Sequence, residues 1–207
     1  MPRLFPRPAL PSLSLALQGG GAHGAFTWGV LDALLESGRF EFDALSGTSA
    51  GAINAVALAE GWQRGRHEGA RESLERLWSA VGDSVAFDAF VIGADAEPAF
   101  APAARAWMHW ARYFAPQQIN PLGLNPLRDV LAAQIDFDRL RAAGAPRVFV
   151  AATRADSGRL RLFGNAEIGV DALLASACLP TLQPAVTIDG QPYWDGGYSA
   201  NPPLFPL

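Results

Sequence analysis

Two short apolar runs near the N-terminus each end at glycine, and each is followed by a helical pattern. Leu13–Gln18 ends at three glycines and precedes Gly24–Ser37, whose large apolar residues fall on one helical stripe. Phe40–Ser46 ends at Gly47 and precedes Ala50–Glu60, which is almost wholly small and apolar, as a buried helix would be. Strand, helix, strand and helix in this order are typical of parallel strands joined by helices. The sequence therefore predicts an α/β fold.

The remaining segments extend this layer with shorter elements. Further helices are predicted over residues Arg64–Val81, Asn125–Gln134, Asp138–Ala143 and Asp171–Ala177, and further strands over Arg147–Thr153, Arg159–Phe163, Val186–Ile188 and Gln191–Trp194. Asp189-Gly190 joins the last two strands as a two-residue hairpin turn that requires positive φ. No clear period is visible from residue 83 to 118.

Composition excludes several classes of protein. The 207 residues are 50% hydrophobic and 17% charged, which predicts a sizeable buried core. All 16 basic residues are arginine, so no P-loop lysine, pyridoxal Schiff base or lysine nucleophile is available. A net charge of -4 leaves no basic footprint for nucleic acid. Cys178 stands alone and the three histidines are far apart, so we expect no disulfide, no metal and no cofactor.

The chain is expected to form one domain after a short arm. Residues 1–12 hold four prolines and two arginines but no apolar signal-peptide core, which predicts a disordered arm before a domain over residues 13–207. No run approaches the roughly 20 apolar residues that span a bilayer. We therefore expect a cytoplasmic protein and leave a peripheral contact with a membrane, and the oligomeric state, open.

The first candidate site is the glycine loop Gly19–Gly24, which follows a predicted strand and opens a predicted helix. It fits the dinucleotide fingerprint G-x-G-x-x-G, and Asp43 lies at about the distance expected of a ribose-binding acid. The N–H groups at a helix N-terminus equally suit the oxyanion of an acyl-transfer intermediate. Because a chain without lysine has no P-loop lysine, the anion that this loop could bind is either a pyrophosphate or an oxyanion.

The second candidate site is Gly47-Thr48-Ser49-Ala50-Gly51, a G-x-S-x-G sequence between a predicted strand and a predicted helix. In that context the motif forms a nucleophile elbow, whose glycines allow a sharp turn that projects the serine hydroxyl from the sheet. An N-cap serine is the alternative interpretation of Ser49. The placement between strand and helix favours the nucleophile.

A serine nucleophile needs a base, and the histidines are poor candidates. His67 lies in a charged segment that is expected to be solvated, and His109 lies in an aromatic segment. His23 is inside the glycine loop but has no carboxylate nearby in sequence to orient it. The remaining candidate is Asp195-Gly196-Gly197, at the end of the predicted hairpin, although turns use the same residues.

Taken in order, Gln18–Gly24, Gly47–Gly51 and Asp195–Gly197 resemble the motifs of the patatin-like phospholipase family. Ala175–Pro180, with Pro184, and Asn201–Pro203 are also similar to segments of that family. The resemblance covers residues 13 to 204. It implies a three-layer α/β/α sandwich around a central, mostly parallel sheet, and hydrolysis of lipid acyl esters by a Ser-Asp dyad without histidine or metal.

The resemblance also implies a role for each motif. Ser49 would be the nucleophile and Asp195 the general base, partly desolvated and within roughly 2.6–3.2 Å of the serine hydroxyl. The oxyanion hole would come from the loop Gly19, Gly20, Gly21, Ala22, His23 and Gly24, chiefly from the N–H groups of Gly20, Gly21 and Ala22. The substrate would be a lipid or phospholipid acyl ester.

Two features depart from the family's pattern. His23 stands where many members have Arg or Lys, so positive charge near the loop would depend on pH. Relatives usually continue well past the segment that resembles Asn201–Pro203, which predicts a domain truncated at its C-terminus. The aromatic residues of Trp107–Phe114 would either line an acyl channel or lid, or form a buried helix face. A nucleotide-binding Rossmann protein and a catalytically inactive lipid-binding module remain alternative hypotheses.

Overall fold

The computed structural model of the chain describes residues 10–84, 91–92, 99–100, 125–180 and 182–207. In chain order its elements are β1 (Ser12–Leu17), η1 (Gly21–His23), α1 (Gly24–Glu36), β2 (Glu41–Thr48), α2 (Ala50–Gly82), β3 (Val91–Ile92), β4 (Ala99–Phe100), α6 (Pro126–Gln134), α7 (Phe137–Arg141), β5 (Arg147–Arg154), β6 (Leu160–Gly164), α8 (Val170–Ser176), β7 (Val186–Ile188), β8 (Gln191–Asp195) and η2 (Gly196–Tyr198). The predicted aromatic helix face, His109 and most of the predicted N-terminal arm lie outside the described residues.

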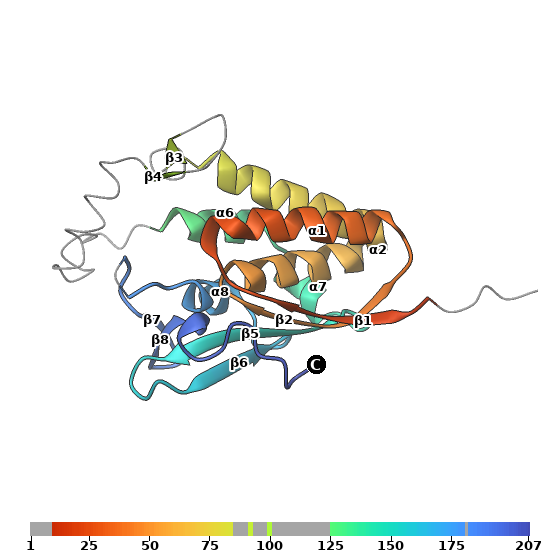
Figure 1. Cartoon of the computed structure of the whole chain (residues 1–207). Coiled ribbons are helices and arrows are strands. Elements are labelled where there is room, and N and C mark those ends of the chain that lie inside the picture. The colour runs from red at the N-terminus through yellow and green to blue at the C-terminus, as the bar shows by residue number, and fades with distance from the viewer. Residues whose placement is uncertain (1–9, 85–90, 93–98, 101–124, 181) are drawn as a thin grey trace, which may run out of the picture.

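A six-stranded sheet forms the centre, in the order β1-β2-β5-β8-β7, with β6 also paired to β5. The first three strands of this path are parallel, whereas β6, β8 and β7 each pair antiparallel with their neighbours. Figure 1 shows α1, α2 and α6 on one side of this sheet. The predicted α/β class is confirmed.

The register on β5 is the feature that organises the site. β2 pairs with β5 as far as Ala151, where its partner is Thr48, and β8 pairs from the next residue, Ala152, where its partner is Asp195. Because β6 overlaps both of these pairings, β6 must lie on one edge of β5, and β2 and β8 must share the other. β2 is parallel to β5 and β8 is antiparallel, so their C-terminal ends meet. Thr48 and Asp195 therefore lie opposite two neighbouring residues of β5, Ala151 and Ala152.

Helix α2 is folded back on itself. Its residues Gly65 and Arg66 have non-helical backbone angles, and the two halves pack antiparallel, as the orange and yellow parts of α2 show in Figure 1. The prediction that the helix beginning at Ala50 ends at Glu60, before Gly61, is wrong. Gly61 lies inside the helix and is needed for close packing, because a Cβ there would meet Ala70 Cα and Ser73 Cβ at 2.7 Å. The fold-back returns the second half of α2 to the region where its first half begins.

Most other predicted elements are confirmed with shifts of one or two residues. Asp189 and Gly190 both have positive φ, as the predicted hairpin turn requires. Asn125 is the N-cap residue of α6, but its side chain does not cap the helix and instead contacts Gln183. A continuous apolar cluster fills the space between the sheet and the helices. Within the described ranges, no helix combines the length and the hydropathy that crossing a membrane requires.

Candidate active site

Ser49 sits on a strained turn between β2 and α2. Its φ of 53° and ψ of -124° are unusual for a residue with a side chain, and such angles persist only where the surroundings enforce them. The flanking glycines have a steric reason. A Cβ on Gly47 would meet the Ala52 backbone at 2.6 Å, and one on Gly51 would meet Gln18 O at 2.6 Å. The geometry is that of a nucleophile elbow.

A buried serine that the sequence reasoning missed holds the elbow. The Ser49 N–H donates to Ser176 Oγ at 2.8 Å, and Ser176 is fully buried at the end of α8. The Ser49 carbonyl accepts the first hydrogen bond of α2, from Ile53 N at 3.1 Å. Both backbone groups of the strained residue are therefore satisfied. The only signal in the sequence was that Ser176 lies in a segment resembling the family.

The Asp195 carboxyl group lies near the same turn, close enough for the Ser49 hydroxyl to influence its pKa. It is only 6% exposed, and its backbone is fixed on both sides, because its N–H donates to Cys178 O at 2.8 Å and its carbonyl accepts from Thr153 Oγ1 at 2.8 Å. Asp195 Oδ1 accepts from Gly197 N at 2.7 Å. Burial raises the pKa of Asp195, while the Gly197 N–H and the Ser49 hydroxyl act in the opposite direction. A raised pKa makes the carboxylate a stronger base.

The glycine loop lies against the elbow on its other side. A Cβ on Gly19 would come within 2.9 Å of Ser49 Cβ. The loop forms the short turn η1, with φ +56° at Gly21, before α1 begins at Gly24. The N–H groups at the start of a helical turn have no intrahelical partner, so those of Gly21 and Ala22 are available to an anion.

Two members of the predicted oxyanion loop serve other purposes. The Gly19 N–H already donates to Asn201 Oδ1 at 2.6 Å. Gly24 is buried at the start of α1, and a Cβ there would meet the Trp78 ring at 2.6 Å and Ala50 Cβ at 2.8 Å. Gly19 therefore ties the loop to Asn201, and Gly24 allows α1 to pack closely against α2. The His23 N–H donates to Gly20 O at 3.1 Å, so the N–H groups that remain for an anion lie in the Gly20–Ala22 part of the loop.

Among the described residues, His23, His67 and Asp43 each have another contact. The exposed His23 ring lies 3.0 Å from the Gly20 carbonyl through Nδ1. His67 was predicted to be solvated, which is wrong: it packs edge-on against Trp62 and Nε2 lies 2.8 Å from Phe40 O. Asp43 lies near the start of β2, away from the glycine loop at the strand's other end, and pairs with Arg147 at 2.6 Å.

A mostly apolar cavity of about 330 Å³ opens at Ser49. It is bounded by both turns and by side chains from α2, α6 and the segment after α8. Trp78, from the returning half of α2, forms one wall, and its Nε1 donates to the buried Asn54, which in turn donates to Gly24 O. The fold-back of α2 therefore builds a wall of the cavity, which periodicity alone could not predict. No cluster of three metal-binding side chains occurs in the described part of the chain.

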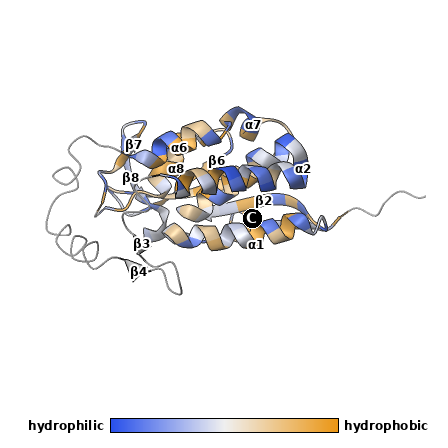
Figure 2. Ribbon diagram, turned by 90° about the horizontal axis from the view of Figure 1, so that it is seen from above, coloured by the Kyte–Doolittle hydropathy of each residue, from blue (hydrophilic) through white to orange (hydrophobic). Residues whose placement is uncertain are grey.

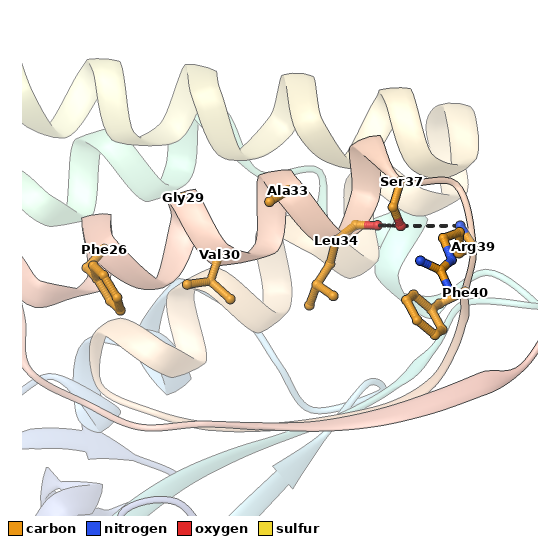
Figure 3. A pocket seen from close by; sticks show the side chains of 8 residues that line it. All are labelled: Phe26, Gly29, Val30, Ala33, Leu34, Ser37, Arg39 and Phe40. Carbon is orange, nitrogen blue, oxygen red and sulfur yellow. Dashed lines mark hydrogen bonds between the residues drawn. The ribbon is translucent and has the colours of Figure 1, made fainter.

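A separate hollow runs along the outer side of α1. Its lining includes Phe26, Val30 and Leu34, whose side chains point the same way from the helix, with Arg39 and Phe40 at one end (Figure 3). Phe26 is 77% exposed, and orange segments of α1 are visible from above the helices in Figure 2. The motif residues are absent from the lining of this hollow. Motif residues line the cavity at Ser49 instead: Gly21 and Ala22 of the glycine loop, and Ser49 and Ala50 of the elbow.

A serine on a strained strand–helix turn, beside a glycine loop with N–H groups available to an anion, is an arrangement suited to acyl transfer and typical of serine acyl hydrolases. The family model for patatin-like phospholipases matches residues 15–207. The chain therefore belongs to the patatin-like phospholipase family.

A search of the curated proteins found no significant match. Among solved structures, the chain is similar to VipD from Legionella pneumophila, with a TM-score of 0.53 and 15% sequence identity. The alignment covers 95% of this chain and 47% of that chain, so the present sequence spans about half the length of VipD. This likeness supports the fold.

Proposed function

We propose that residues 13–207 form a serine lipid acyl hydrolase, of the phospholipase A or esterase type, that acts through a Ser-Asp dyad. The observation that carries the proposal is the meeting of β2 and β8 on adjacent residues of β5, with Thr48 opposite Ala151 and Asp195 opposite Ala152. Ser49 follows the first of these residues directly. The apolar cavity beside it suits an acyl chain, and the exposed Leu179 in its lining suits contact with a lipid surface.

In the proposed reaction, the Ser49 hydroxyl attacks the ester carbonyl carbon while Asp195 accepts its proton. The carbonyl oxygen becomes negatively charged in the tetrahedral intermediate and takes hydrogen bonds from the N–H groups of Gly20, Gly21 and Ala22. The C–O bond to the alcohol then breaks, and the alcohol leaves with the proton held by Asp195. Water attacks the acyl-enzyme in the same way and releases the fatty acid and the free serine.

A carboxylate is a weak base for an alcohol, so the remaining barrier must be lowered by the surroundings. Burial raises the pKa of Asp195, which narrows the gap between the two groups. Ser49 lies at the N-terminus of α2, where the helix dipole favours negative charge on the hydroxyl oxygen. The largest contribution is assigned to the oxyanion donors, because they act only as charge develops.

Nucleotide binding is less well supported. The ribose-binding acid of a Rossmann fold follows the C-terminal end of the second strand. Asp43 instead lies near the N-terminal end of β2 and is paired with Arg147. The fingerprint of the glycine loop is accounted for by the turn that places N–H groups beside Ser49. Titration with NAD(P) should therefore show no saturable binding.

The decisive experiment is labelling with a fluorophosphonate probe, followed by mapping of the labelled peptide. Labelling at Ser49, together with hydrolysis of p-nitrophenyl acyl esters and phospholipid, is the expected result. Ser49→Ala should abolish both while leaving the circular dichroism spectrum unchanged. A folded wild-type protein that neither reacts with the probe nor cleaves esters would instead be a catalytically inactive lipid-binding module.

A further inference from the structure

The segment Ser199–Pro203, here called the strap, runs from the acidic motif along the outer face of the sheet. Gly47 of β2 faces α2, so Ser46 and Thr48, on either side of it, face away from the helices. The Ser46 hydroxyl donates to Pro203 O at 2.6 Å, and the Thr48 hydroxyl donates to Ala200 O at 2.9 Å. The strap is therefore fastened to the half of β2 that leads into the elbow, and Figure 1 shows the C-terminal end on this side of the sheet.

The strap is also joined to β5, the strand that pairs with β8 and so holds the acidic motif in place. The Ser199 hydroxyl shares a hydrogen bond of 2.7 Å with the Thr153 hydroxyl of β5, and Thr153 donates to the carbonyl of Asp195. The same short segment thus contacts β2, which leads into Ser49, and β5, whose Thr153 binds the Asp195 carbonyl. Its position is fixed by several independent contacts.

One residue of the strap reaches the glycine loop. Asn201 Oδ1 accepts the Gly19 N–H at 2.6 Å, a contact between residues 182 positions apart. At this point the loop touches the nucleophile, since a Cβ on Gly19 would meet Ser49 Cβ at 2.9 Å and Asn201 Oδ1 at 3.4 Å. The loop's next turn is closed by the bond from His23 N to Gly20 O at 3.1 Å, but its outer side is open, since a Cβ on Gly21 would meet nothing within 4 Å.

We propose that Asn201 is a positioning residue that fixes the glycine loop relative to Ser49, an inference that rests on the proposed hydrolase function. Oxyanion donors accelerate a reaction only when they are held in place before charge develops. Glycine-rich backbone is intrinsically free, so this loop needs a tether at the end nearest the nucleophile. The Asn201 amide supplies that tether from a segment already fastened to β2 and β5.

The test compares Asn201→Ala with Asn201→Asp in the full chain. Asn201→Ala removes the acceptor, and a displaced loop should lower kcat by about 10- to 100-fold while KM for a p-nitrophenyl ester stays within about twofold. The rate of fluorophosphonate labelling at Ser49 should fall in parallel. Asn201→Asp keeps an acceptor in place and should retain more activity than the alanine variant.

Asn165→Ala is the matched control, because Asn165 Oδ1 also accepts a backbone N–H, from Val148 at 2.7 Å, at a distance from the cavity. It should lower the Tm without lowering kcat. Wild-type kcat in Asn201→Ala, or a loss confined to KM, would overturn the positioning role even though the wild type remains an active hydrolase. Absence of fluorophosphonate labelling at Ser49 in the wild type would instead contradict the proposed hydrolase function.

Discussion

The β1–α1 and β2–α2 connections follow the same plan of strand, glycine-rich turn and helix, and they lie in contact at one edge of the sheet. They differ in the groups that they present to the site. The β2–α2 turn presents a side chain, that of Ser49, on a residue with φ +53°. The β1–α1 turn presents backbone N–H groups around Gly21, which has φ +56°. One turn would supply the nucleophile and the other would receive the negative charge.

The two turns also differ in what holds them. A Cβ on Gly47 or Gly51 would collide with backbone atoms, so the elbow is fixed by close packing. The glycine loop is closely packed at its ends, at Gly19 and Gly24, but a Cβ on Gly21 between them would meet nothing within 4 Å, so the middle of the loop depends on tethers such as the Asn201 contact. A reactive side chain can be positioned by the core beneath it, whereas N–H donors that face an incoming substrate must be left uncovered.

The largest effect should come from removing the base without changing the shape of the elbow. Asp195→Asn can still accept the Gly197 N–H, but it cannot take the serine proton, so kcat should fall by about 10²- to 10⁴-fold. Ester hydrolysis by the purified variant measures this loss. An Asp195→Asn variant with full activity would reassign the base, with His23 as the next residue to test.

Asp195→Asn should also change how the stability of the protein depends on pH. Because burial raises the pKa of Asp195 above 3.8, the folded state binds its proton more tightly than the unfolded chain does. This contribution stabilises the fold at low pH and is lost as pH rises through the raised pKa. Asp195→Asn should therefore gain Tm relative to the wild type at pH 8 and lose that advantage at pH 4, as thermal melts can show. The kcat/KM of the wild type should fall on the acid side at a pH above 3.8.

The next largest effect should come from distorting the elbow. Gly51→Ala places a methyl group 2.6 Å from Gln18 O, which should destabilise the fold by about 1–3 kcal/mol and lower kcat by more than about tenfold. Gly29→Ala is the matched control: Gly29 is an exposed α1 residue with open space around it, so alanine should stabilise the helix by roughly 0.5–1 kcal/mol. Equal Tm values for the two variants would contradict the packing explanation.

A smaller effect should follow from removing the support beneath the elbow. Ser176→Ala leaves the Ser49 N–H without its acceptor, which should cost about 1–3 kcal/mol of stability and lower kcat by roughly tenfold. Ser73→Ala removes another buried hydroxyl, which donates to Glu60 in the fold-back of α2. That variant should lose stability without losing kcat. Equal kcat in the two variants would show that Ser176 does no more than fill its site.

The sequence predicted the motifs well because each combines local backbone demands with a recognisable order along the chain. Gly47 and Gly51 flank Ser49 for steric reasons that act within one turn, and Asp189-Gly190 specifies its own hairpin. These constraints act between neighbouring residues, so the residue types in the sequence are enough to predict them.

The sequence could not predict contacts that depend on tertiary register. Ser176 and Asn201 contact the site across 127 and 182 residues, and apart from the family resemblance of their segments nothing nearby in the sequence distinguishes them from other polar residues. Trp78 reaches the cavity only because α2 folds back at Gly65, although the glycine at position 61 suggested an earlier end. Helical periodicity reports which face is buried but not where the helix returns.

The smallest effect should come from the open turn. Gly21→Ala imposes a side chain on a residue with φ +56°, which costs about 1–2 kcal/mol of backbone strain, but the methyl group meets nothing within 4 Å. We expect kcat to fall by at most about fivefold, the equivalent of about 1 kcal/mol. Gly21→Asn should be closer to the wild type, because asparagine adopts left-handed angles more readily. If Gly21→Ala reduced kcat as severely as Gly51→Ala, the loop would be as closely fitted as the elbow, and the contrast between a packed turn and a tethered one would fail.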